Sequence, residues 1–167
     1  LHFGWFGGWP IKLVYAVLGA GLTVVTTSGV AIWLARRRDK GRPAPMWERI
    51  WIATVWSQPL AFGASAALTF IPAIPPLASW AIVTLLALGA AFVWTAPAAI
   101  SRRLRLASAL CLGLAVIAHM AVWRGAAADP VAWITNAVAM LLAAGLVLSV
   151  WPRTARPLGA PSPAPAE

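Results

Sequence analysis

The chain has 167 residues, of which 61% are hydrophobic and only 10% are charged. Because soluble domains carry about 25% charged residues, this composition excludes an ordinary soluble domain and predicts a protein of the lipid bilayer. The formal net charge of +9 could suit a nucleic-acid-binding protein, but Lys and Arg lie in short clusters between apolar runs, which argues against nucleic acid as a partner.

Five apolar segments are long enough to cross a membrane, since a spanning helix needs about 20 residues. In chain order they cover residues 9–34, 50–70, 77–100, 104–123 and 131–151. The predicted separators are a basic loop at 36–49, a proline turn at 71–76, a second basic loop at 101–105 and a link that ends at Pro130. The sequence therefore predicts an all-α fold, a polytopic transmembrane helix bundle of about five helices.

Short segments flank the predicted membrane domain of residues 9–151. Residues 1–8 are expected to be a periplasmic lead-in, and residues 152–167, rich in Pro and Ala, are expected to be a disordered cytoplasmic tail. The chain begins without an initiator Met at the mouth of a predicted membrane helix. We therefore expect it to continue a longer polypeptide or to be the product of a split gene.

The distribution of Lys and Arg predicts the orientation of the chain. With alternating spans, six of these residues in 36–49, three in 101–105 and two after residue 151 fall on one side, and only Lys12 and Arg124 fall on the other. Basic residues gather on the cytoplasmic side of membrane proteins. The pattern predicts a multi-pass membrane protein, with this chain's N-terminus outside and its C-terminus cytoplasmic.

Two histidines, His2 and His119, are predicted near the outer face. His119 lies about five residues before the end of its helix, which is roughly 7 Å below the surface at a rise of ~1.5 Å per residue. Asn136, next to Thr135, enters at the same depth on the following antiparallel helix, so we expect it to fix the tautomer of His119. An ionisable residue inside a membrane predicts a functional site. A hydrogen bond that only holds helices together would also explain His119, and His2, at the interface, needs no function.

Small polar residues match in depth on the first two predicted helices, nearer the inner face. They are Thr26, Thr27 and Ser28 on the first helix, and Ser57 and Gln58, followed by Pro59, on the second. One interpretation is a small pocket for a quinone or the edge of a cofactor. The favoured interpretation is close packing of the two helices through Ser, Thr and Gly29, although packing explains Gln58 poorly.

Several other classes of function lack their motifs. Asp39, Glu48, Asp129 and Glu167 all lie in loops, at helix ends or in the tail, which weakens a proton-coupled transporter. The sequence has no CxxCH, no CxxC zinc pattern, no HExxH and no Walker loop, and its single cysteine, Cys111, forms no internal disulfide. A hydrolase and a covalently attached c-type haem are therefore poorly supported.

The first 38 residues carry an LHxG…FGG stretch, an apolar helix with a Ser–Gly pair, a Trp and a basic cluster. These are Leu1, His2, Gly4, Phe6, Gly7, Gly8, Ser28, Gly29, Trp33 and Arg36 to Arg38. In this pattern the chain resembles the PepSY-associated transmembrane proteins, at the point where a periplasmic PepSY-type region ends and a membrane helix begins. From residue 39 to Trp151 the likeness is one of architecture only.

This resemblance implies a role in iron uptake. The family includes bacterial inner-membrane proteins, some of them regarded as ferric-siderophore reductases that hold haem b through histidines of the membrane helices. It would assign His2 and His119 as axial ligands of the haem iron, with Asn136 and Thr135 beside them, and a ferric siderophore as the substrate. The expected partner is the missing N-terminal part or an upstream-encoded PepSY half.

Two alternatives come from other classes of function. The chain could be a membrane anchor or partner-binding module without a redox centre, or it could be a transporter subunit. A b-type haem absorption band would separate electron transfer from the anchor, and flux into vesicles would identify the transporter.

Overall fold

The computed structural model describes residues 8–70, 74–123, 125 and 129–151. Within these ranges the chain forms five α-helices and no strand, which confirms the predicted all-α fold. The helices are α1 (Gly8–Asp39), α2 (Pro45–Leu68), α3 (Pro76–Val93), α4 (Pro97–Val122) and α5 (Pro130–Val150). The predicted lead-in up to residue 7, His2, part of the proline turn and the tail lie outside the described residues.

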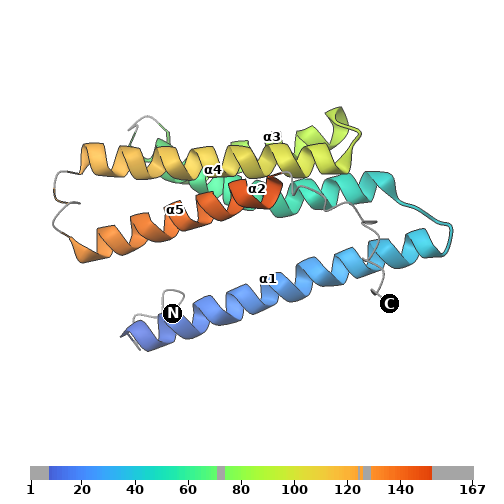
Figure 1. The fold of residues 1–167 in the computed structure, drawn as a ribbon, viewed down its shortest axis with the longest axis horizontal. Coiled ribbons are helices and arrows are strands. Elements are labelled where there is room, and N and C mark those ends of the chain that lie inside the picture. Colours follow the sequence, from blue (N-terminus) through green and yellow to red (C-terminus); the bar gives the residue numbers. More distant parts are fainter. Residues whose placement is uncertain (1–7, 71–73, 124, 126–128, 152–167) are drawn as a thin grey trace, which may run out of the picture.

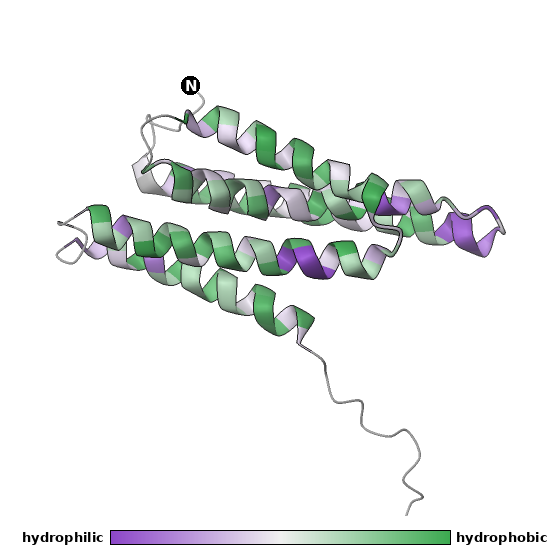
Figure 2. Ribbon diagram, turned by 90° about the horizontal axis from the view of Figure 1, so that it is seen from above, coloured by the Kyte–Doolittle hydropathy of each residue, from purple (hydrophilic) through white to green (hydrophobic). Residues whose placement is uncertain are grey.

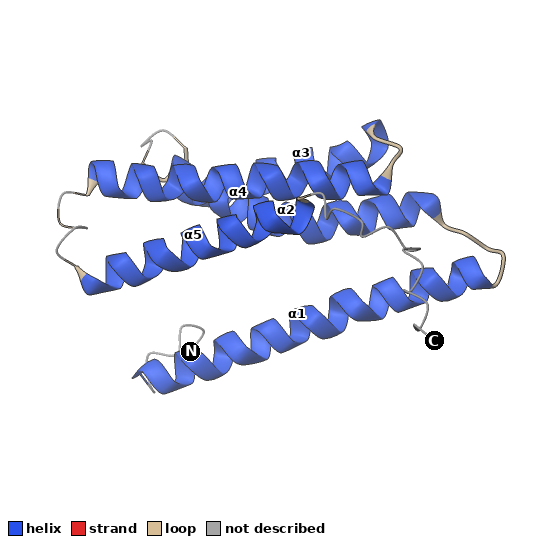
Figure 3. Cartoon of the chain, viewed as in Figure 1, coloured by secondary structure: helices blue, strands red, loops and turns tan. Residues whose placement is uncertain are grey.

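The helices run up and down beside one another (Figures 1 and 3). The central helix is α2, which packs along both α3 and α4, and α5 covers another side of α4. α1 contacts only α2 among the described helices, and does so sparsely. Only 6% of the apolar stretch of α1 is buried, compared with 17% in each of α3, α4 and α5. The bundle therefore consists of four packed helices and one outlying helix.

Four of the helices, α1, α3, α4 and α5, are long and apolar enough to cross a membrane. Many large hydrophobic side chains are exposed on the bundle. Most of each helix is hydrophobic, and hydrophilic residues gather near the α1–α2 turn and in the first part of α4 (Figure 2). The chain is therefore a membrane protein. α2 is not among the four, in contrast to the five expected spans, because this central helix turns small and polar residues such as Ser57, Gly63 and Ser65 toward its neighbours.

The two basic loops predicted at residues 36–49 and 101–105 differ from the structure: the first is much shorter, and the second is part of a helix. The segment 36–49 is helical except for residues 40–44, where Gly41 adopts a φ of +67°, and Ser101 to Arg105 lie inside α4. Prolines explain the shift, because Pro45 and Pro97 occupy the first turn of α2 and α4, where a missing N–H costs nothing. The residue before each proline is not helical, so α3 ends at Val93 rather than near residue 100.

Small residues let the helices approach closely, as in other membrane bundles. The buried core at one end consists of Ala53, Ala87, Ala91, Ile100 and Leu104. Gly63 lies at a close contact of α2 with α4, since a Cβ atom at this position would lie 3.2 Å from the backbone nitrogen of Leu112. The small glycine therefore allows α2 and α4 to approach closely at this point.

Polar side chains also join the helices. The hydroxyl of Ser79 in α3 donates to the Oγ of Ser65 in α2 over 3.0 Å. The Arg105 guanidinium of α4 donates to Ser149 of α5 over 3.1 Å and stacks 4.7 Å from the ring centroid of Trp56 in α2. Contacts of this kind between polar side chains of different helices help to hold membrane bundles together.

Candidate functional site

His119 lies in the last turn of α4, between the ends of α2 and α5. Its Nδ1 lies 2.9 Å from the Oδ1 of Asn136 on α5, and Asn136 is buried, with 7% of its surface exposed. This is the interhelical hydrogen bond that the matched depths of the two residues predict. It forms because α4 and α5 are antiparallel neighbours joined by a short link.

The partners of Asn136 indicate which tautomer the neutral imidazole adopts. The Asn136 amide donates from Nδ2 to the Sδ of Met120 over 3.1 Å, so its carbonyl oxygen faces His119 as an acceptor. A carbonyl acceptor places the imidazole proton on Nδ1 and leaves the lone pair on Nε2. Among the described residues, Nε2 has no hydrogen-bond partner.

Two aromatic rings lie nearly parallel to the imidazole. The centroid of Trp123 is 5.2 Å from that of His119 with an interplanar angle of 24°, and Phe70 at the end of α2 lies at 6.1 Å and 26°. These contacts restrict rotation of the imidazole, so its two nitrogens keep their directions. The contact of Trp123 with His119 could be expected from the sequence, because residues four apart lie on the same side of a helix. The sequence gives no such indication for the contact of Phe70 with His119.

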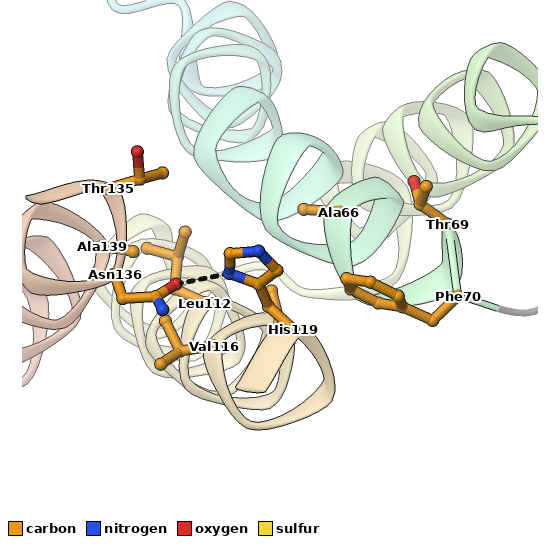
Figure 4. Close-up of a pocket in the computed structure, with 10 residues that line it drawn as sticks. Ala66, Thr69, Phe70, Leu112, Val116, His119, Thr135, Asn136 and Ala139 are labelled. Carbon is orange, nitrogen blue, oxygen red and sulfur yellow. Dashed lines mark hydrogen bonds between the residues drawn. The ribbon is translucent and has the colours of Figure 1, made fainter. Parts of the chain in front are cut away.

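A cavity of about 340 Å³ lies beside the imidazole, a volume within the range of small-molecule sites. Its walls come from three helices and the turn after α2: Ala66 of α2 with Thr69 and Phe70 just after it, Leu112, Ala115, Val116 and His119 of α4, and Thr135, Asn136 and Ala139 of α5. Figure 4 shows Nδ1 turned to Asn136 and the other ring nitrogen turned toward Ala66. The free lone pair of His119 therefore faces the α2 wall of the cavity.

The structure brings three of the four predicted site residues together. His119, Asn136 and Thr135 line the same cavity, although the Thr135 hydroxyl donates to the backbone oxygen of Val131 in its own helix over 2.9 Å. His2 is outside the described residues, so its distance from His119 stays a prediction. Within the described ranges, no group of three or more His, Cys, Asp and Glu side chains could hold a metal ion.

The second polar cluster forms a groove rather than a packed contact. Thr26, Thr27 and Gln58 line a cavity of about 480 Å³ between α1 and α2. A second cavity of about 410 Å³ shares Trp51 and Thr54 with it, and we call the two together the α1–α2 groove. The favoured prediction of close packing is wrong at Gly29, where an added Cβ atom would have no neighbour within 4 Å.

No family model, curated protein or solved structure matches this chain. The resemblance to PepSY-associated proteins therefore stays a prediction, and the argument for function depends on the His119 site.

Proposed function

We propose that this chain is the membrane part of a b-type haem electron-transfer protein that reduces periplasmic ferric iron or a ferric siderophore. The observation that carries the proposal is the orientation of His119. Its Nδ1 is bonded to Asn136 and its Nε2 is free at the edge of a cavity. The family resemblance of the first 38 residues adds the iron substrate, which the site geometry does not specify.

The residues present fit one axial position of a haem. A histidine ligand binds iron through one ring nitrogen while the other donates to a carbonyl, which fixes the tautomer and the ring plane. His119 has this arrangement, and most of the cavity wall is apolar. We propose His2 as the second axial ligand, in keeping with the resemblance.

Each residue of the site has a separate task in this proposal. When bound, haem supplies a one-electron centre at the outer end of the bundle. Asn136 holds the proton on Nδ1 and keeps Nε2 directed away from α5. The side chains of Leu112, Val116 and Ala139 make the cavity wall beside Asn136 apolar. Thr135 shapes the wall, because its hydroxyl hydrogen is already donated to its own helix.

Titration of haemin into the purified full chain in detergent tests the proposal, with the upstream-encoded partner added in a parallel series. We expect a b-type absorption band that saturates at a fixed stoichiometry and is lost in His119→Ala. Thr135→Val is the matched control, because it keeps the shape of the cavity wall and removes only a hydroxyl group. Colourless, folded protein in both series would overturn the proposal.

The second candidate, an anchor or partner-binding module without a redox centre, is favoured by α1. This helix exposes large apolar side chains around most of its surface, among them Leu13, Val17 and Leu22. A helix that contacts the bundle so sparsely has room for another membrane helix beside it. Crosslinking from cysteines placed along α1 would identify a partner helix, and a haem-free chain that still captures it would support this candidate.

A further inference from the structure

The α1–α2 groove combines apolar walls with polar groups that lack partners. Trp51 and Phe62 of α2 supply large apolar surfaces, and none of the residues that line the two cavities is charged. Thr26 makes no hydrogen bond to the described residues. Gln58 donates from Nε2 to the Oγ of Ser57 over 3.2 Å, which leaves its second amide hydrogen and its carbonyl oxygen unpaired within the described part of the chain.

Pro59 adds an acceptor to the same wall. It lies inside α2 and has no N–H, so the carbonyl of Val55, four residues earlier, receives no helical hydrogen bond from that position. Both Val55 and Pro59 line the groove. The groove therefore offers donors at Thr26 and Gln58 and an acceptor at Gln58, beside a Val55 carbonyl that lacks the helical bond from residue 59.

From these groups we infer that the α1–α2 groove binds the head group of a lipid-soluble quinone. The two ring oxygens of a quinone accept hydrogen bonds, here from Thr26 of α1 and Gln58 of α2, and the hydroxyls of the reduced form donate to the acceptors on α2. A phospholipid chain needs no hydrogen bonds, and its charged head group finds no countercharge among the lining residues. The apolar surfaces of Trp51 and Phe62 suit the ring and the start of the isoprenoid tail.

Binding at the groove does not depend on the haem, but its role rests on the proposed function. Gln58 and Ala66 lie eight residues apart on α2, which is about 12 Å along the helix axis, so one helix lines both the groove and the His119 cavity. A quinol that becomes a quinone loses two electrons and two protons. Two ferric ions would each gain one electron, and the protons would pass to water.

Binding of decylubiquinone to the haem-free full chain in detergent, followed by isothermal titration calorimetry, tests the inference. We expect saturable binding that Thr26→Val and Gln58→Leu each weaken about 3- to 10-fold, as the loss of one hydrogen bond requires. Thr23→Val is the matched control. Thr23 lines the same groove, but its hydroxyl already donates to the Gly19 oxygen over 2.8 Å, so its removal should leave the affinity unchanged.

Three results would overturn the inference: no saturable binding, equal losses in Thr26→Val and Thr23→Val, or equally tight binding of decylbenzene, which has no ring oxygens. The last result would identify the groove as a site for hydrocarbon alone. Since the assay uses haem-free protein, a failure of haem binding at His119 leaves this test unaffected. Quinone binding can likewise fail while the haem titration succeeds.

Discussion

The contact of α2 with α4 at Gly63 gives a graded prediction for the stability of the bundle. A Cβ atom here would lie 3.2 Å from the Leu112 nitrogen and 3.3 Å from both the Cys111 Cβ and the Leu112 Cγ. Gly63→Ala should change the free energy of unfolding by less than about 1 kcal/mol, because a better helix propensity offsets the tight contact. Gly63→Leu must push the helices apart and should cost about 1–3 kcal/mol.

Unfolding in mixed micelles with increasing SDS, followed by circular dichroism, measures both variants. Gly145→Leu on α5 is the control, because an added Cβ atom there has no neighbour within 4 Å, and it should be neutral or stabilising. Gly63→Leu should also weaken haem binding, since Ala66 follows on the same helix and lines the His119 cavity. Equal stability of the two leucine variants would refute the close approach of α2 and α4.

Three further predictions concern single hydrogen bonds. Asn136→Leu should lower the affinity for haem about 10- to 100-fold in the haemin titration, because the imidazole loses the partner that orients it. An unchanged affinity would contradict the orienting role of Asn136. Ser79→Ala should destabilise the bundle by about 1 kcal/mol in SDS unfolding, because the hydrogen bond to Ser65 is lost. Ser28→Ala, on the exposed surface of α1, is the control. An effect of Ser79→Ala no larger than that of the control would argue against the contact between Ser79 and Ser65. Asp129→Ala should lower the free energy of unfolding by about 1 kcal/mol and increase amide hydrogen exchange in the first turn of α5. The reason is that the Asp129 carboxylate accepts a hydrogen bond from the Val131 N–H over 2.8 Å. Unaltered exchange in this turn would exclude a capping role for Asp129.

The helices were predictable from hydropathy, but their ends were not. A spanning segment needs about 20 apolar residues, and this rule locates α1, α3, α4 and α5, whereas α2 is a helix whose most apolar stretch is less apolar than those of the other four. The cluster at 101–105 has the charge of a loop, yet it continues α4, because long Arg side chains reach polar partners from a helix. Arg105 does so through Ser101 and Ser149. Pro97 was the better signal for the start of α4.

The shared level of His119 and Asn136 along the bundle was predictable, whereas the distance between helices was not. His119 and Asn136 meet because they lie at the same level on neighbouring antiparallel helices. The order and length of the apolar segments predict both the shared level and the antiparallel arrangement. Thr26 and Gln58 also share a depth, but depth says nothing about how far α1 stands from α2. The groove between them therefore required the three-dimensional structure.

Rescue of a cavity variant by imidazole tests the role of His119 most directly. His119→Gly, purified from cells supplied with haem, should lack the low-spin spectrum of a haem with two histidine ligands. Added imidazole should restore it by occupying the vacated position. A His119→Gly protein with an unaltered low-spin spectrum, or one that imidazole does not change, would show that His119 is not an axial ligand.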